Sequence, residues 1–192
     1  MDFDSKSEIK KKAFEVLKDG VKNRDSLFHT LTLSTFDGEC IDSRVMVLRE
    51  FNQKERRLRF HTDARSKKIK DLGISQVSSV IGYDPVQKIQ IRLKGYLKMS
   101  HKNKDTLEAW EKSQDISKKC YSVKDGSTSI ISTPSSHDFH IKDVVLEDGY
   151  ENFSILYFYF NSLEFLYLQR SGHRRCKFEW SDGKLRSFWL VP

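Results

Sequence analysis

The chain has 192 residues and a formal net charge of +7, a length that allows a substantial core and predicts one domain spanning residues 1–192. Hydrophobic residues make up 38% and charged residues 32%, as in ordinary soluble globular proteins, and no apolar run approaches the ~20 residues of a membrane-spanning helix. Cys40, Cys120 and Cys176 are scattered and odd in number, which predicts free thiols rather than disulfides or a zinc site. Because residues 1–12 are charged and lack an export signal, we expect a cytoplasmic protein.

The positive charge is concentrated in one segment. Residues 44–70 contain ten Lys and Arg against three Asp and Glu, a surplus equal to that of the whole chain. Such a local concentration indicates an anionic partner, which is a phosphate-bearing small molecule, a nucleic acid or an acidic surface.

The first predicted element is an amphipathic helix over residues 5–19, with Gly20 near its end. Strands follow in chain order, and Asp37-Gly38 marks a hairpin turn between the first two. The nine expected strands are 27–35, 41–48, 58–62, 77–83, 89–99, 153–160, 163–169, 174–180 and 187–191. Beyond a short basic helix after residue 63, helices are expected at 103–112 and 137–147.

Residues 122–136, "SVKDGSTSIISTPSS", are rich in Ser, Thr and Gly, so they form either a mobile linker or a loop that becomes ordered on a ligand or partner. Many short antiparallel strands, few helices and no βαβ alternation predict a mainly β fold with flanking helices, closed or partly closed as a barrel.

Basic residues fall on three of these elements. Arg44 and Arg49 lie near the two ends of one strand, and Gln90, Arg92 and Lys94 share one face of another by the period of two. Since Arg44 and Arg49 are five apart, they can share a ligand only if the strand ends or bulges before Arg49.

The third basic cluster lies in "HTDARSKKIKDL", residues 61–72, where Asp63 or Ser66 is suited to the N-cap of a helix. The first turn of this helix carries Arg65, Lys67 and Lys68, although a helix N-terminus favours anions. Either these side chains extend into water, or an anion binds between them.

Other motifs offer less chemistry. His137 and His140 have HxxH spacing, but no carboxylate or cysteine completes a metal set, so no metal site is expected. The aromatic run 153–160 is apolar on both faces, which indicates a core rather than a platform for stacking bases. A phosphate site without a visible nucleophile or acid–base pair fits a cofactor that supplies its own chemistry.

With these motifs in view, the chain resembles the pyridoxamine 5′-phosphate oxidase-like FMN-binding split-barrel family. The resemblance rests on "SRVMVLRE", "LRFHTDARSKKIKDL" and "IQIRLKG", and on "LEFLYL…HRRCKFEW…LVP" at the C-terminus. It implies a six-stranded antiparallel split β-barrel, a homodimer, and FMN bound at the subunit interface.

The resemblance also implies roles for individual residues. The strand from Arg44 to Arg49 would follow the flavin, Lys67 and Lys68 would hold its phosphate, and Lys177 stands where the family has an arginine of the second subunit. The residues expected at the cofactor are Arg44, Val45, Met46, Val47, Arg49, His61, Thr62, Arg65, Ser66, Lys67, Lys68, Gln90 and Lys177.

The chain departs from the family on the substrate side. Its counterpart of the oxidase's Arg-Leu-His-Asp-Arg motif is residues 174–177, which is one residue shorter and lacks the histidine, and Leu166 replaces an expected tryptophan. The leading hypothesis is therefore an FMN-dependent oxidoreductase whose small substrate need not be pyridoxamine phosphate, with its catalytic residues unassigned. Two alternatives stay open: an FMN carrier or sensor without turnover, and a basic barrel that binds single-stranded nucleic acid.

Overall fold

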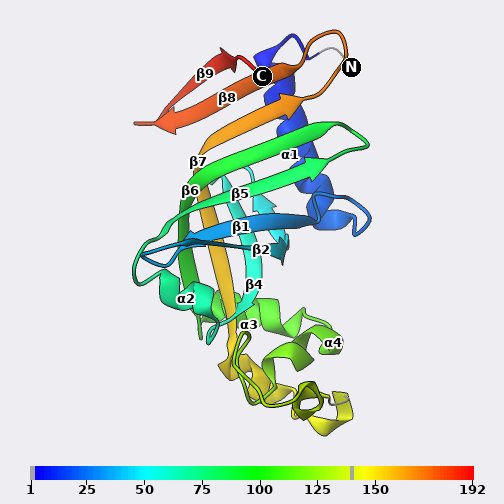
Figure 1. The fold of residues 1–192 in the computed structure, drawn as a ribbon, viewed down its shortest axis with the longest axis vertical. Coiled ribbons are helices and arrows are strands. Elements are labelled where there is room, and N and C mark those ends of the chain that lie inside the picture. Colours follow the sequence, from blue (N-terminus) through cyan, green and yellow to red (C-terminus); the bar gives the residue numbers. More distant parts are fainter. Residues whose placement is uncertain (1–2, 139–140) are drawn as a thin grey trace.

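The computed structural model describes residues 3–138 and 141–192 (Figure 1). In this part of the chain nine strands form one antiparallel sheet. They are β1 Thr30–Phe36, β2 Ile41–Val47, β3 Glu50–Asn52, β4 Arg57–Asp63, β5 Val77–Asp84, β6 Ile89–His101, β7 Phe153–Tyr167, β8 Arg174–Ser181 and β9 Lys184–Leu190. The α-helices are α1 Lys6–Lys22, α2 Lys67–Asp71, α3 Lys104–Glu111 and α4 Asp115–Lys118, and 3-10 turns span Lys119–Tyr121, Pro134–His137, Ile141–Asp143 and Glu147–Glu151.

The strand order is β2-β1-β5-β6-β7-β4-β3, with β8 added to β7 and β9 to β8. The sheet branches at β7, whose first half pairs with β4 and whose second half pairs with β8. The mainly β class with flanking helices is confirmed, and the sheet is not closed. It has nine strands in the described residues, where the resemblance implied six.

The strand β7 replaces two expected strands, 153–160 and 163–169, with one of 15 residues. The polar pair Asn161-Ser162 lies at a register shift opposite Lys94 and Gly95, so the chain bulges there without leaving the sheet. A side chain on Gly95 would collide with the backbone oxygen of Tyr159, so glycine is required at this close approach.

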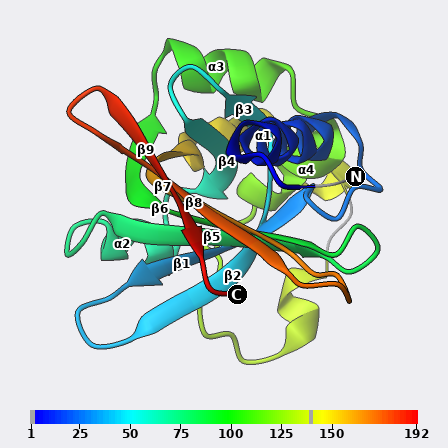
Figure 2. The same cartoon turned by 90° about the horizontal axis from the view of Figure 1, so that it is seen from above.

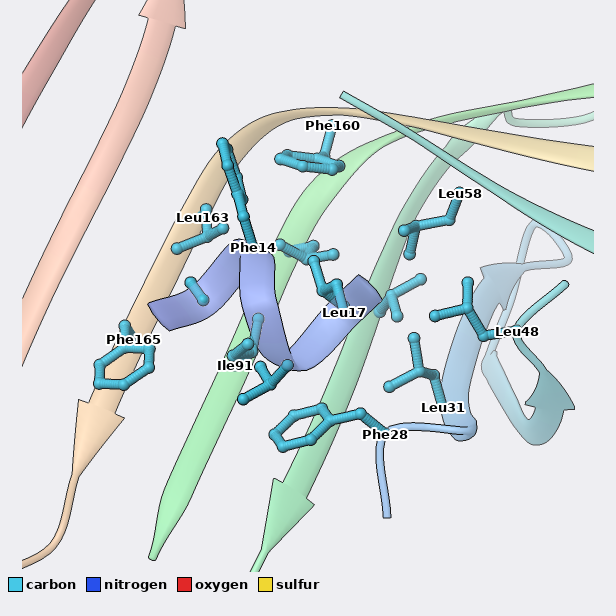
Figure 3. Packing of buried hydrophobic residues seen from close by; sticks show 14 of the residues in the cluster. Phe14, Leu17, Phe28, Leu31, Leu48, Leu58, Ile91, Phe160, Leu163 and Phe165 are labelled. Carbon is cyan, nitrogen blue, oxygen red and sulfur yellow. The ribbon is translucent and has the colours of Figure 1, made fainter. Parts of the chain in front are cut away.

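The main core lies between α1 and the inner face of the sheet (Figures 2 and 3). Phe14 and Leu17 of α1 pack among buried side chains such as Leu31, Ile91 and Phe165. Burial of each such side chain contributes about 1.5–3 kcal/mol. A second, smaller cluster packs β7 against α3 at the far end of the molecule from the β8–β9 hairpin (Figure 1). It consists of Ala109, Trp110, Phe153, Ile155 and Tyr157.

The two clusters use opposite faces of the aromatic run. Phe153, Ile155 and Tyr157 belong to the smaller cluster, while Phe158 and Phe160 belong to the main core. The interpretation of this run as a two-sided core is therefore confirmed.

Two helix predictions differ from the structure. The α-helix expected at 137–147 is absent from the described residues of that range, which contain 3-10 turns, and Phe139 and His140 lie outside the description. Gly20 does not end α1, which continues to Lys22. Instead, Gly20 is buried where the helix meets the backbone of Phe28, and the ring of His29 hydrogen-bonds to the Gly20 carbonyl. None of the described helices is long and apolar enough to cross a membrane.

We expect Gly20→Ala to destabilise the protein by about 1–3 kcal/mol, because the new Cβ would overlap the carbonyl group of Phe28. In an exposed helix the same change would stabilise the protein by about 1 kcal/mol. The sign of the change in unfolding free energy therefore distinguishes a closely packed Gly20 from an exposed one. Urea unfolding measures the effect, with Lys18→Ala on the exposed face of α1 as the control. A neutral or stabilising Gly20→Ala would show that α1 does not pack this closely.

Candidate functional site

A cavity of about 430 Å³ lies where β4 ends and α2 begins. The sheet side contributes Met46, His61, Thr62 and Lys68, and the segment 120–131 covers the other side. We call it the Lys68 cavity. The part of the 122–136 loop that reaches it supplies three consecutive hydroxyl residues, Ser127, Thr128 and Ser129.

The ammonium group of Lys68 is held by hydroxyl groups. Its Nζ donates to Thr62 Oγ1 at 3.2 Å and to Ser66 Oγ at 3.0 Å, and both hydroxyl residues are buried. Burial lowers the pKa of Lys68, and the nearby Arg44 lowers it further. Lys68 forms no ion pair within residues 3–138 and 141–192, although the charges of Asp63, Asp42 and Asp71 act against these two effects and raise its pKa.

The turn between β4 and α2 fixes these hydroxyl groups. Ser66 lies at the N-cap position of α2, but its Oγ donates to the carbonyl of Asp63 at 2.7 Å instead of capping the helix. The carboxylate of Asp63 accepts the backbone N–H of Arg65 at 2.7 Å. The hydroxyl hydrogen of Ser66 and the carboxylate of Asp63 are thus used within the turn. The ammonium of Lys68 donates to the hydroxyl oxygens of Thr62 and Ser66.

Arg65 binds the covering segment. Its guanidinium pairs with Asp63 at 2.6 Å and donates to the carbonyls of Val123 and Lys124 at 2.9 and 2.8 Å. Arg65, one of the residues expected at the cofactor, therefore holds the loop over the cavity. This contact also explains Gly126, where an added Cβ would lie 2.9 Å from Arg65 Cβ.

Two other cations expected at the cofactor, Arg44 beside the flavin and Lys67 at the phosphate, already have carboxylate partners. Arg44 pairs with Asp42 at 2.6 Å and donates to Thr35 Oγ1 at 2.8 Å. Lys67 pairs with Asp37 at 2.7 Å, a contact that raises the pKa of the lysine. Lys67 is exposed, whereas the turn leaves Lys68 half-buried.

Arg49 lies in a different cavity of about 460 Å³, between β4 and α3. Because β2 ends at Val47, Arg49 leaves the strand, and its backbone N–H donates to Arg59 instead. Arg24, Arg57 and Arg59 also line this arginine cavity. The structure therefore separates Arg49 from Arg44 and Lys68. The alternation Arg57-Leu58-Arg59-Phe60-His61 is a period-two signal that could have revealed the additional arginines.

His61 lines both cavities. Burial, followed by the charges of Arg59 and Arg49, lowers its pKa to about 3, so the ring is neutral at pH 7. Its Nε2 is buried and has no hydrogen-bond partner in the described structure. The ring meets Phe153 edge-on at 4.9 Å between centroids.

Four expected residues lie on the outer face of the sheet, opposite α1. One row across seven strands consists of Val45, Thr32, Ile81, Arg92, Glu164, Lys177 and Phe188. Val47 and Gln90 lie two residues along their strands from this row, and Gln90 is next to Tyr83 and Leu166. Neither Gln90 nor Lys177 lines the Lys68 cavity.

We expect acid to destabilise the protein through His61. With a folded pKa of about 3 and an ordinary value of 6.5, the unfolded chain takes up the proton first as the pH falls. Between pH 6 and 4, wild type should lose about 1.4 kcal/mol of stability per pH unit through His61. His61→Gln should lack this loss. Urea unfolding across this range measures it, and His173→Gln at an exposed site is the control. Equal acid sensitivity in His61→Gln and wild type would contradict the neutral, desolvated ring.

Comparison with known proteins gives a match to one family model. Residues 11–101 match the family model described as pyridoxamine 5′-phosphate oxidase, FMN-binding domain. No curated protein matches the chain.

Among solved structures, the chain is similar to a pyridoxamine 5′-phosphate oxidase-related, FMN-binding protein from Nostoc punctiforme, with a TM-score of 0.76, 20% identity, and coverage of 95% of this chain and 96% of that one. It is also similar to PhzG from Burkholderia lata in complex with tetrahydrophenazine-1-carboxylic acid, at TM-score 0.75, 16% identity, and 96% and 91% coverage. Campylobacter jejuni ChuZ matches at TM-score 0.55, 9% identity, and 94% and 62% coverage. At these identities the likeness establishes the fold. The resemblance to the pyridoxamine 5′-phosphate oxidase-like FMN-binding split-barrel family is thus confirmed, by the family model over residues 11–101 and by the fold over nearly the whole chain.

Proposed function

We propose that the protein binds FMN with its phosphate in the Lys68 cavity and acts as a homodimeric oxidoreductase on a small substrate. One observation carries the proposal: Lys68 is half-buried, donates its hydrogen bonds to hydroxyl groups, and lacks an ion pair in the described chain. A buried cation of this kind is costly unless an anion joins it.

The groups around Lys68 fit a phosphate. Thr62 and Ser66 present hydroxyl groups beside the ammonium, and Arg44 is close enough to lower the pKa of Lys68. A phosphate dianion would offset both cations, and each charge-assisted hydrogen bond contributes about 1.5–3 kcal/mol. The hydroxyl groups of the covering segment add further donors on the opposite wall.

The outer sheet face supports the dimer. It exposes apolar side chains where a monomer would present polar ones, and they lie on several rows of the same face: Ile41, Val45, Val77, Ile81, Tyr83 and Phe188. An exposed apolar face of this kind is typical of an interface, and in a two-fold dimer the same face serves both subunits. Gln90 and Lys177 lie on this face, so in the proposal they reach the flavin from the partner subunit.

The chemistry that FMN supplies when bound is the acceptance of a hydride from the substrate, after which a second acceptor reoxidises the flavin. The chain's own residues bind the cofactor, cover it and orient it. Neutral His61 forms one wall, and Tyr121 forms another with its phenol protonated, because burial raises its pKa to about 12. Neither of these two groups changes its charge near neutral pH.

Two further observations bear on the alternatives. The C-terminal arginines are engaged in ion pairs, Arg174 with Asp4 at 2.7 Å and Arg175 with Glu164 at 2.6 Å, which favours an FMN carrier or sensor if no substrate displaces them. Anaerobic photoreduction followed by a substrate screen separates that function from turnover.

Most aromatic rings of 153–160 are buried, which argues against base stacking. The cysteines are free, as predicted, and support our proposal of a cytoplasmic protein.

We expect Lys68→Met to weaken FMN binding at least tenfold, since it removes the charge that meets the phosphate. The same change should stabilise the FMN-free protein, because it removes a buried cation. Fluorescence quenching of FMN gives the Kd, and thermal unfolding gives the stability.

Lys67→Met is the matched control, because Lys67 is half-exposed and pairs with Asp37 and Asp71. It should change the Kd much less. If Lys68→Met binds FMN as tightly as wild type, the phosphate site is misplaced.

We expect Ile81→Asp to convert the protein to a monomer, because it puts a charge in the middle of the outer sheet face. Val86→Asp, on the exposed turn between β5 and β6, should leave the dimer intact. Light scattering after size-exclusion chromatography measures the mass. A wild-type monomer at micromolar concentration would refute the dimer.

A further inference from the structure

A basic and aromatic groove lies between α1, the turn that joins β3 to β4, and the end of β8. Its hollow has a volume of about 430 Å³ and is lined by Lys10, Phe14, Gln53, Lys54, Arg56 and Trp180. We call it the Trp180 groove. None of these residues lines the Lys68 cavity or the arginine cavity, so the groove has no part in the proposed FMN site.

Arg56 is held in the groove by its backbone and by the ring of Trp180. Its carbonyl accepts the backbone N–H of Phe160 at 3.0 Å, and its Nε donates to the carbonyl of Phe160 at 3.3 Å. The guanidinium lies over Trp180, 5.2 Å from the ring centroid. Arg56 has no ion pair with any residue in the described part of the chain, so the terminal nitrogens of this fixed fork are available to an anion.

The backbone of Arg56 adopts a conformation that does not favour arginine. Its φ of 51° lies in the left-handed region, which glycine occupies without steric cost. Backbone strain of this kind is concentrated at ligand clamps and other functional sites. The presence of arginine at this position is therefore explained by its side chain and not by its backbone.

The other cations of the groove also lack acidic partners. Lys10 and Lys54 form no ion pair within residues 3–138 and 141–192, and no carboxylate lines the hollow. Glu55, the acidic residue of the same turn, is used by Arg57 at 2.6 Å. On α1, Lys6 lies one turn before Lys10, a spacing at which like charges repel each other. The charge of the groove thus favours an acidic ligand.

Exposed apolar side chains extend the groove along β9. Leu185 and Trp189 pair with Trp180 and Cys176, so they lie on the side of the sheet that carries the main core. They are nevertheless 42% and 44% exposed. Lys6 Nζ donates to the carbonyl of Ser187 at 3.0 Å, which places the start of α1 beside the middle of β9. An apolar strip that continues beyond the hollow, next to unpaired cations, suits an extended peptide better than a compact small molecule.

We propose that the Trp180 groove docks an acidic segment of a partner protein. An aromatic or large apolar side chain of the segment packs against Phe14 and Trp180, and its Asp or Glu residues bind Arg56, Lys10 and Lys54. A second copy of the chain, with its net charge of +7, would be repelled by a groove of the same sign, whereas an acidic segment is attracted to it. The interaction does not depend on FMN and adds a partner protein to the proposed function.

Fluorescence anisotropy with the fluorescein-labelled peptide Glu-Asp-Glu-Phe-Glu-Asp-Glu tests the groove in the purified full chain. Wild type should bind it saturably, and about tenfold more tightly than the neutral isostere Gln-Asn-Gln-Phe-Gln-Asn-Gln. Arg56→Gly should weaken binding about fivefold and leave the fold intact, because glycine accepts the φ of 51°. Lys88→Gly is the matched control, since Lys88 is an exposed cation at a φ of 57° in the turn between β5 and β6.

The indole N–H signals in NMR spectra give a second reading. The peptide should shift those of Trp180 and Trp189 and leave that of Trp110 unchanged, because Trp110 packs against Phe153 in the smaller cluster. Equal binding of the neutral peptide, unchanged binding in a folded Arg56→Gly variant, or a shift at Trp110 alone would each overturn the proposal.

Two further outcomes would assign the groove to another occupant and overturn the proposal as well. Tighter binding of an oligothymidylate of the same length than of the acidic peptide would indicate nucleic acid. Self-association of wild type that Arg56→Gly removes, measured by light scattering, would indicate a second copy of the chain.

Discussion

The burial of the Lys68 ammonium among hydroxyl groups is the constraint on which the site depends. A cation in such a place normally pairs with a carboxylate. Here the nearby carboxylates are used by other cations: Asp63 by Arg65, and Asp37 and Asp71 by Lys67. In the described residues, the turn from β4 to α2 thus leaves Lys68 with hydroxyl partners and without an ion pair of its own.

The cost of burying a charge also governs His61, which lines both cavities. A protonated ring would add a positive charge beside Arg49 and Arg59, and its burial would make that charge costlier, so the ring stays neutral. A neutral wall of this kind separates the Lys68 cavity from the arginine cavity without itself competing for an anion.

Much of the fold could be predicted because the signals were local. The strand 41–48 and the helix 103–112 follow from alternation and periodicity within a few residues, and both are present as β2 and α3. The bulge in β7 was missed because it depends on Gly95, a partner far away in the chain. The three-residue strand β3 is too short for any period to show.

The site was only partly predictable for a related reason. Thr62, Ser66 and Lys68 come together because they are neighbours on one turn. Adjacent Lys67 and Lys68 could not be told apart, since the difference between them is set by Asp37 on the hairpin between β1 and β2. Which of two adjacent cations binds a ligand is a property of their carboxylate partners, and those partners are fixed by the tertiary structure.

The position of Gln90 and Lys177 leads to the last step. Both lie on the outer sheet face, while Lys68 and Met46 lie in a cavity on the other side of β2 and β4. No movement of side chains within one chain brings two faces of a paired sheet together, because the strand pairing fixes which side each residue occupies. If all of these residues contact one flavin, the outer face must come from a second subunit, and the apolar row around Ile81 is what that subunit would cover. The composite cofactor site therefore requires the dimer, whereas the dimer does not require the site.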